Sequence, residues 1–303
     1  MIQKVSKLKL DLYGKIPSSL DDIDVKELRE KYPEFLFDEL NYEYKGSSFT
    51  ALLIHSEFQD QLARSPNCVL LADGTFSMVP KMYKQLYTSH IIVGPRSFPL
   101  SFVLSVNRPK ELYLEVFKFM KEKIGCNPSV VITDFEAASR TAIREIWCTC
   151  LLKGCLFHYV QSLMRRLGEL HLKNEYSHNY EFNAIIREYF ALPFVPKENV
   201  SDYHQSILNE ARQKLDGRLV DLFREFDAYF QSTWMNGVFM IEDWNQLGDL
   251  EHRSNNWSES FHAAFARKFS KSHPNIIQFL DTLKGTLLVM EYEYSDLLLN
   301  LRS

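Results

Sequence analysis

The sequence lacks long apolar runs. No window approaches the ~20 consecutive apolar residues that a membrane-spanning helix needs, and the segment after Met1 lacks the continuous apolar stretch of a signal peptide. An excess of basic charge is also lacking, because 35 Lys and Arg stand against 39 Asp and Glu, for a formal net charge of −4. We therefore expect a soluble intracellular protein whose contacts with nucleic acid, if any, come from local basic clusters.

Cysteine is scarce, with five residues in 303. An odd number of cysteines in a chain long enough to form a hydrophobic core predicts reduced thiols and no disulfide framework. Four residues do have the chemistry of zinc ligands and lie close in sequence, namely Cys148, Cys150, Cys155 and His158. Small buried thiols are common beside strands, so burial is the favoured interpretation and a zinc site is the alternative.

The pattern of apolar residues predicts an α/β core in the order strand, strand, strand, helix, strand, helix, strand. The expected strands cover residues 68–72, 86–93, 98–106, 130–132 and 150–157, and the expected helices cover 111–123 and 137–147. Later segments with helical periodicity cover 160–172, 181–190, 204–230, 256–269 and 276–299. The last of these predicts a packing face, with a dimer face as the alternative.

These elements divide the chain into four parts. Residues 1–66 are expected to form an α-rich pre-domain, and residues 67–158 the first part of the core. Residues 159–250 are expected to form a helical insertion, and residues 251–303 a core helix followed by a C-terminal helix.

Two aspartates, Asp73 and Asp134, each follow a short apolar strand. Side chains at strand ends gather at one edge of an open α/β sheet. Two carboxylates there can share divalent metal ions that activate water or a 3′-hydroxyl for attack on a phosphodiester, and Mg²⁺ suits such oxygen ligands. The alternative is that both aspartates cap helices.

Glu259 is the third candidate acid, and it lies in the segment Arg-Ser-Asn-Asn-Trp-Ser-Glu-Ser-Phe-His over residues 253–262. On a helix, Asn255, Glu259 and His262 share one face because they are four and three residues apart. A solvated helix face is the alternative for Glu259, and a surface position is the alternative for His262. The basic residues Arg267 and Lys268 follow, and they are candidates for phosphate contacts or for a solvated surface.

Four motifs in this order resemble the Mutator-like (MULE) transposases of the DDE superfamily, and most closely the animal group associated with FLYWCH zinc fingers. They are Leu71-Ala-Asp73-Gly-Thr-Phe76, Thr133-Asp134-Phe-Glu-Ala-Ala138, Gly154-Cys155-Leu-Phe-His158 and the segment 253–262. The resemblance implies a ribonuclease H-like core, a mixed sheet with flanking helices, and an all-α insertion between the second Asp and the Glu.

The resemblance also implies the chemistry. Asp73, Asp134 and Glu259 would be the catalytic residues and would hold Mg²⁺, with Mn²⁺ as a substitute, for cleavage and transfer of double-stranded DNA at transposon ends in the nucleus. The candidates for DNA contact or support of the site are Cys155, His158, Asn255, Asn256, His262, Arg267 and Lys268. The alternative is a transposon-derived, catalytically inactive module that associates with DNA or with proteins. A homo-oligomer is a possible assembly, and no membrane partner is expected.

Overall fold

A computed structural model of the chain describes residues 16–248 and 254–300. The chain divides into two units built from interleaved segments. We call the first the sheet unit; it comprises the described residues up to Val130, residues 141–150 and the residues from Asn256 onward. We call the second the helical unit; it comprises residues 131–140 and 151–255.

The sheet unit contains five strands in the spatial order β1-β2-β5-β4-β3, and the neighbours that pair are antiparallel. They are β1 (Leu36–Tyr44), β2 (Ser47–His55), β3 (Val69–Thr75), β4 (Gln85–Val93) and β5 (Arg96–Ser105). The turn between β1 and β2 uses Lys45 and Gly46, whose φ angles are 52° and 74°. A two-residue hairpin turn with two positive φ angles matches the twist of the strands that it joins.

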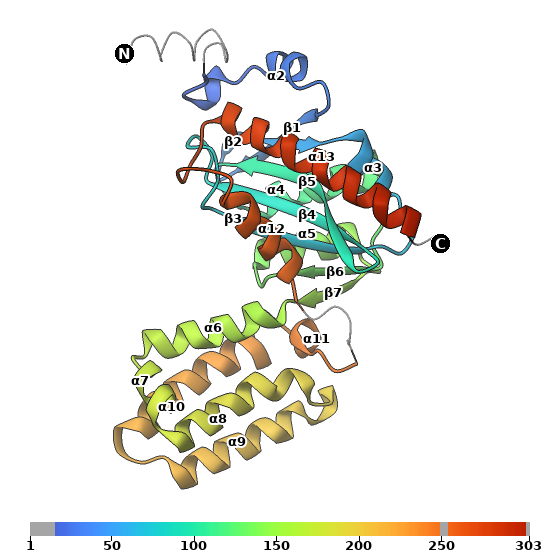
Figure 1. Cartoon of the computed structure of the whole chain (residues 1–303). Coiled ribbons are helices and arrows are strands. Elements are labelled where there is room, and N and C mark those ends of the chain that lie inside the picture. The colour runs from blue at the N-terminus through green and yellow to red at the C-terminus, as the bar shows by residue number, and fades with distance from the viewer. Residues whose placement is uncertain (1–15, 249–253, 301–303) are drawn as a thin grey trace. The chain divides into compact units, whose positions relative to one another are not determined.

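Helices cover both faces of this sheet (Figure 1). The helices of the sheet unit are α2 (Val25–Lys31), α3 (Glu57–Ala63), α4 (Lys110–Phe119), α12 (Asn256–Ala266) and α13 (Ile276–Asn300). Successive strand residues point to opposite faces. Leu86 of β4 is buried in one cluster with Phe261 of α12 and Leu280 of α13, whereas the ring centroid of Tyr87 lies 4.9 Å from that of Tyr113 of α4. The helices α12 and α13 therefore cover one face and α4 covers the other.

The helical unit includes two short strands, β6 (Val130–Thr133), apart from its first residue, and β7 (Leu151–Gly154). Its helices are α6 (Leu156–Glu169), α7 (Lys173–His178), α8 (Tyr180–Ala191), α9 (Val200–Lys214), α10 (Gly217–Phe230) and the short α11 (Ile241–Trp244). Large aromatic residues form its core, and the indole Nε1 of Trp244 donates a hydrogen bond to the carbonyl oxygen of Trp234 at 2.8 Å. Trp234 is 1% exposed and is therefore a core residue.

The structure confirms an α/β chain, and it differs from the expected elements in three places. The N-terminal part contains the strands β1 and β2, where we expected an α-rich segment. The expected helix over 204–230 is two helices, because the chain breaks between α9 and α10 at Gly217, which has a φ of 52°. The expected strand over 150–157 ends at Gly154, since α6 begins at Leu156.

Two further expectations concern surfaces. Of the stripe expected on the C-terminal helix, Ile277, Leu280, Leu283 and Leu287 are buried, and Leu288 is exposed. The stripe therefore packs onto the sheet, as the favoured interpretation predicts. Within the described residues, no helix combines the length and the apolar character needed to cross a membrane.

His55, the last residue of β2, has a carboxylate beside each of its ring nitrogens. Its Nδ1 lies 2.7 Å from Asp60 Oδ1, and its Nε2 lies 3.0 Å from Asp38 Oδ2. Burial alone would lower the pKa of His55, but the hydrogen bonds and charges of Asp38 and Asp60 outweigh burial and raise the pKa to about 9. His55 therefore carries a positive charge in the folded protein at neutral pH.

This charge predicts a pH dependence of stability. The folded-state pKa of about 9 lies above the value of about 6.5 in an unfolded chain, so the stabilisation is complete below about pH 6.5 and is lost as the pH rises through about 9. We expect the free energy of unfolding to fall by roughly 2 kcal/mol over this range, and the His55→Gln variant not to show this fall. Chemical denaturation at a series of pH values measures both proteins, and parallel pH profiles would contradict the prediction.

Candidate functional site

Asp73 lies inside strand β3 and not at its end. The strand continues to Thr75, and Asp73 pairs with Thr88 of β4. The expectation that the strand ends before Asp73 is therefore wrong. Gly74 fits in the strand because the side chain of Gln85 crosses over it, and a Cβ on Gly74 would lie 2.5 Å from Gln85 Nε2. A residue in the middle of a strand cannot cap a helix, which excludes the capping alternative for Asp73.

His262 of α12 is the neighbour of the Asp73 carboxylate. Helix α12 packs across β3, β4 and β5, and His262 Nδ1 lies 3.3 Å from Asp73 Oδ2. Both residues are nearly inaccessible to solvent, at 4% exposure for Asp73 and 7% for His262. The surface alternative for His262 is therefore wrong, and the structure brings together two of the candidate site residues.

Two residues of β4 extend this contact. His262 Nε2 lies 2.8 Å from the Thr88 hydroxyl, and His90 Nε2 lies 3.2 Å from the same hydroxyl. Burial, together with the charge of His262, lowers the pKa of His90 well below its ordinary value, so His90 is neutral. The Thr88 hydroxyl also donates to the backbone carbonyl oxygen of Asp73 at 3.5 Å, so it links both histidines to the strand residue that carries the carboxylate.

The sequence did not predict Thr88 and His90 as residues of the candidate site. Their only local signal is a polar Thr-Ser-His run inside an otherwise apolar strand.

Glu259 lies on α12, three residues before His262 and thus about one turn away on the same face. Its side chain is half-buried, so a fully solvated helix face does not describe it. Asn256 is the exposed first residue of α12. The sheet unit therefore carries Asp73 on β3 and Glu259 on a helix that packs against β3.

Asp134 follows β6 directly and is half-buried. Its Oδ1 accepts a hydrogen bond from the backbone N–H of Glu136 at 3.1 Å, which forms the local turn that leads into α5 (Ala137–Ile146). The helix-capping alternative is therefore partly right for Asp134, because its side chain stabilises the turn that precedes α5.

The ring of Phe135 packs directly against the backbone of Gly154, and this contact holds the loop that carries Asp134. A Cβ on Gly154 would lie 2.1 Å from the ring of Phe135 and 2.8 Å from the carbonyl oxygen of Asp243. The backbone N–H of Cys155 donates to the carbonyl oxygen of Thr133 at 2.9 Å, joining the ends of β7 and β6. The second and third motifs are therefore neighbours, and the glycine of the third motif is there because no side chain fits.

Cys155 and His158 lie at the start of α6. Cys155 is fully buried, and its Sγ lies within 4.8 Å of a ring nitrogen of His158. The backbone N–H of Asn255, the buried residue that directly precedes α12, donates to Cys155 Sγ at 3.1 Å. Cys155 therefore holds the chain at the residue before the helix that carries Glu259. A thiolate and an imidazole are both metal-ligand types.

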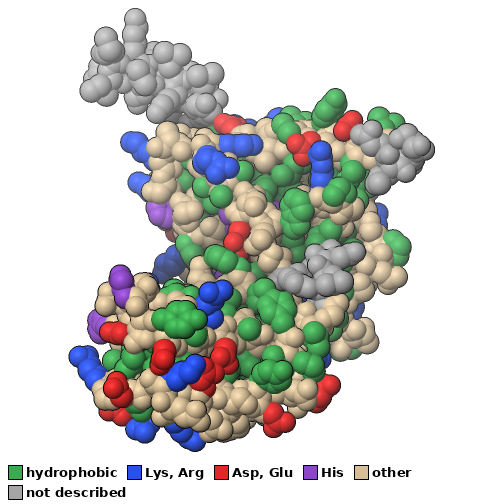
Figure 2. Space-filling model, turned by 60° about the horizontal axis from the view of Figure 1, so that its bottom comes forward, with side chains coloured by type: hydrophobic (Ala, Val, Ile, Leu, Met, Phe, Trp, Pro, Cys, Tyr) green, Lys and Arg blue, Asp and Glu red, His purple; other side chains and the backbone are tan. Residues whose placement is uncertain are grey.

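The basic candidates lie beyond α12, which ends at Ala266. Arg267 and Lys268 are exposed, and Lys268 Nζ donates to Thr286 Oγ1 of α13 at 2.7 Å. Lys268 also lines a pocket of about 840 Å³ together with Lys81 and Lys271. Over the face of the helical unit visible in Figure 2, basic and acidic side chains are interspersed. The three lysines of this pocket therefore form a local basic cluster in a chain whose net charge is negative.

Residues 69–162 match the family model of the MULE transposase domain. The match runs from β3 into α6, and it includes Asp73, Asp134, Cys155 and His158, while Glu259 lies beyond it. No curated protein matches the chain. The match confirms the resemblance to the MULE transposases, and it indicates a transposase-like function that involves DNA. The association with FLYWCH zinc fingers stays a prediction.

The contact of Phe135 with Gly154 predicts a sharp cost for adding one methyl group. We expect Gly154→Ala to lower the free energy of unfolding by roughly 1–3 kcal/mol, because the ring and the backbone of Asp243 must move. Gly285→Ala is the matched control, since a Cβ at this position of α13 meets no atom within 4 Å. The control should be neutral or stabilising by up to about 1 kcal/mol. Chemical denaturation compares the two, and equal effects would contradict the assignment.

Proposed function

We propose that this chain cleaves and joins DNA strands by the DDE mechanism, with Asp73, Asp134 and Glu259 as the carboxylates that hold Mg²⁺ or Mn²⁺. The contact between His262 and Asp73 carries the proposal. A carboxylate in the middle of a strand, nearly closed to solvent and oriented by an imidazole, is costly to bury. The same helix, α12, carries both His262 and the proposed metal-binding acid Glu259.

The spacing of two strands supports a role for Asp134 in the same site. Ser129 and Cys68 directly precede β6 and β3, and the N–H of Ser129 donates to the carbonyl oxygen of Cys68 at 3.0 Å. Asp134 lies five residues after Ser129, and Asp73 lies five residues after Cys68. This equal spacing, together with the match of residues 69–162 to the MULE transposase domain, supports Asp134 as one of the proposed metal-binding acids.

The donor set suits the proposed ion. Mg²⁺ binds through a few carboxylates and keeps waters and phosphate oxygens as its other ligands. When bound, it lowers the pKa of an attacking water or 3′-hydroxyl and stabilises the leaving oxygen. His262 Nδ1 lies 3.3 Å from one oxygen of Asp73, so it orients the carboxylate and leaves the remaining lone pairs for the ion. Thr88 and His90 hold His262 in that orientation, so the carboxylate is positioned before substrate arrives.

We also propose a ribonuclease H-like core with an all-α insertion. The antiparallel strands β3, β4 and β5 precede a helix and β6, as in a ribonuclease H-like core, and α6 to α10 form the all-α insertion between the second Asp and the Glu. DNA, at transposon ends, is the proposed substrate, and Lys81, Lys268 and Lys271 are proposed to contact its phosphates. A nuclear location and a homo-oligomer accompany this proposal.

Metal binding and DNA nicking test the three acids. Calorimetry with Mn²⁺ and Mg²⁺, and nicking of supercoiled plasmid, should show binding and cleavage for the wild type. Asp73→Asn, Asp134→Asn and Glu259→Gln should each lower the nicking rate by at least roughly 100-fold. Glu169→Gln is the control, because this acid of the helical unit is 54% exposed and its change should leave both readouts unchanged. A wild type that neither binds metal nor nicks DNA would favour the inactive, transposon-derived module.

The role of His262 makes a separate prediction. His262→Gln should weaken Mn²⁺ binding by roughly 10–100-fold, because the group that orients a metal-binding carboxylate is removed. Thr88→Val should have a smaller effect in the same direction, since the ring of His262 then loses its hydrogen-bond partner at Nε2. His178→Gln, at an exposed histidine of α7, is the control. Wild-type Mn²⁺ affinity in His262→Gln would remove His262 from the site.

A further inference from the structure

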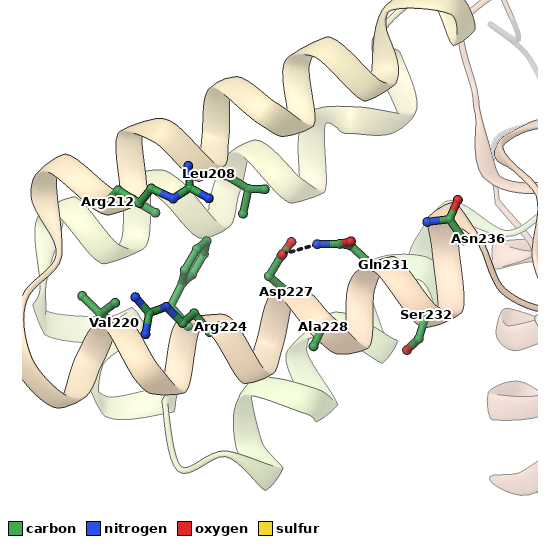
Figure 3. Close-up of a pocket in the computed structure, with 11 residues that line it drawn as sticks. Leu208, Arg212, Val220, Arg224, Asp227, Ala228, Gln231, Ser232 and Asn236 are labelled. Carbon is green, nitrogen blue, oxygen red and sulfur yellow. Dashed lines mark hydrogen bonds between the residues drawn. The ribbon is translucent and has the colours of Figure 1, made fainter.

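The helical unit contains a pocket of about 590 Å³ between α9 and α10 (Figure 3). Pockets of roughly 300–1,000 Å³ hold small organic ligands. We propose that this pocket binds a nucleotide, with the base against its apolar wall, an N–H of the base donating to Asp227, and the phosphate between Arg212 and Arg224. The inference goes beyond the proposed function, and it does not depend on the three carboxylates.

Asp227 is the acceptor that would meet the base. It is 6% exposed, and Figure 3 shows it at the pocket with its bond to Gln231. Its Oδ1 lies 2.6 Å from His204 Nε2 and accepts from the Tyr189 hydroxyl at 2.8 Å, and its Oδ2 accepts from Gln231 Nε2 at 2.6 Å. Burial alone would raise the pKa of Asp227, but the hydrogen bonds from His204, Gln231 and Tyr189 outweigh it and lower the pKa.

The pocket thus contains a fixed carboxylate that is charged at neutral pH. Three bonds leave acceptor capacity on a carboxylate, which has about four positions. An imino or amino N–H of a nucleobase is a neutral donor of the right kind, whereas a second carboxylate would be repelled. An acceptor at this place therefore selects a ligand with a donor on its ring.

Two arginines supply the complementary site for an anion. Arg212 comes from α9 and Arg224 from α10, and Figure 3 shows both at the end of the pocket away from Asn236. Arg224 is paired with Asp221 at 3.1 Å, but both side chains are 72% exposed, and such surface pairs contribute little. Arg212 Nη1 donates to Asn209 Oδ1 at 3.3 Å, also at an exposed position. Both arginines can therefore turn to a phosphate, which guanidinium groups bind with two parallel hydrogen bonds.

The remaining walls fit a planar base. Leu208, Val220 and Phe223 supply apolar side chains to the pocket, and Figure 3 shows Leu208 between Arg212 and the polar end, with Val220 on the far side of Arg224. That end is built from the π-helical turn η5 (Gln231–Met235), which follows α10 directly. A Cβ on Gly237 would lie 1.8 Å from the carbonyl oxygen of Ser232, so the chain closes tightly after this turn. Turns of this type occur frequently at functional sites.

The nucleotide has two possible sources, a free mononucleotide or an unpaired nucleotide of a DNA strand, and the experiment separates them. A fluorescently labelled oligothymidylate is titrated with the full chain in EDTA, and thymidine monophosphate and inorganic phosphate are then added as competitors. Arg212→Ala/Arg224→Ala should weaken binding at least roughly 10-fold. Arg187→Ala/Arg218→Ala removes the same charge at two exposed arginines of α8 and α10 that do not line the pocket, and it should bind like the wild type.

A second variant tests whether binding needs the space of the pocket and not only the charge of its two arginines. Ala228 is exposed and lines the pocket, so Ala228→Phe fills the space while both arginines remain, and it should also weaken binding at least roughly 10-fold. Competition by thymidine monophosphate supports a mononucleotide site, and oligothymidylate binding without such competition supports a strand. Equal competition by inorganic phosphate, or wild-type binding by both pocket variants, would overturn the proposal. The titration contains EDTA and measures binding alone, so a failure of DNA cleavage leaves this test intact.

Discussion

The burial of one carboxylate, Asp73, constrains much of the sheet unit. An acid in the middle of a strand is expensive to bury without a partner, and His262 is its partner across the interface between α12 and β3. For His262 to reach Asp73, α12 must lie across β3, β4 and β5. Phe261 and Phe265, which are buried in the core under this helix, keep it there. Because a helix is rigid over one turn, the position of His262 also fixes the direction in which Glu259 leaves α12.

Much of the core could be predicted because its strands are continuous apolar runs between turn residues. The runs over 86–93 and 98–106 became β4 and β5 almost residue for residue. Strand β1 was missed because its buried residues, such as Phe37 and Tyr42, alternate with charged residues in an acidic segment. The break between α9 and α10 was missed because the helical periodicity continues on both sides of Gly217, and a positive φ at one glycine leaves little trace in the pattern.

The acids of the candidate site were found because each stands beside a strong local pattern. Thr88 and His90 were not, since their role depends on the register that sets Thr88 opposite Asp73 and places His90 two residues further along the same face of β4. A register is decided by the packing of the whole sheet, and a single sequence does not contain it in any local motif. The role of Gly154 was hidden for a similar reason, because it depends on where the ring of Phe135 comes to lie.

The helical unit is held by a second buried carboxylate. Asp227 of α10 joins Tyr189 of α8, His204 of α9 and Gln231 of η5 through three short hydrogen bonds. Replacing such a network by apolar residues is often neutral or stabilising, so its presence is explained better by the geometry that it specifies than by stability. The geometry specified here is that of the elements around the pocket. A pocket whose acceptor is fixed before binding loses little free energy to reorganisation when a ligand enters, and this preorganisation makes the face between α9 and α10 suited to recognition.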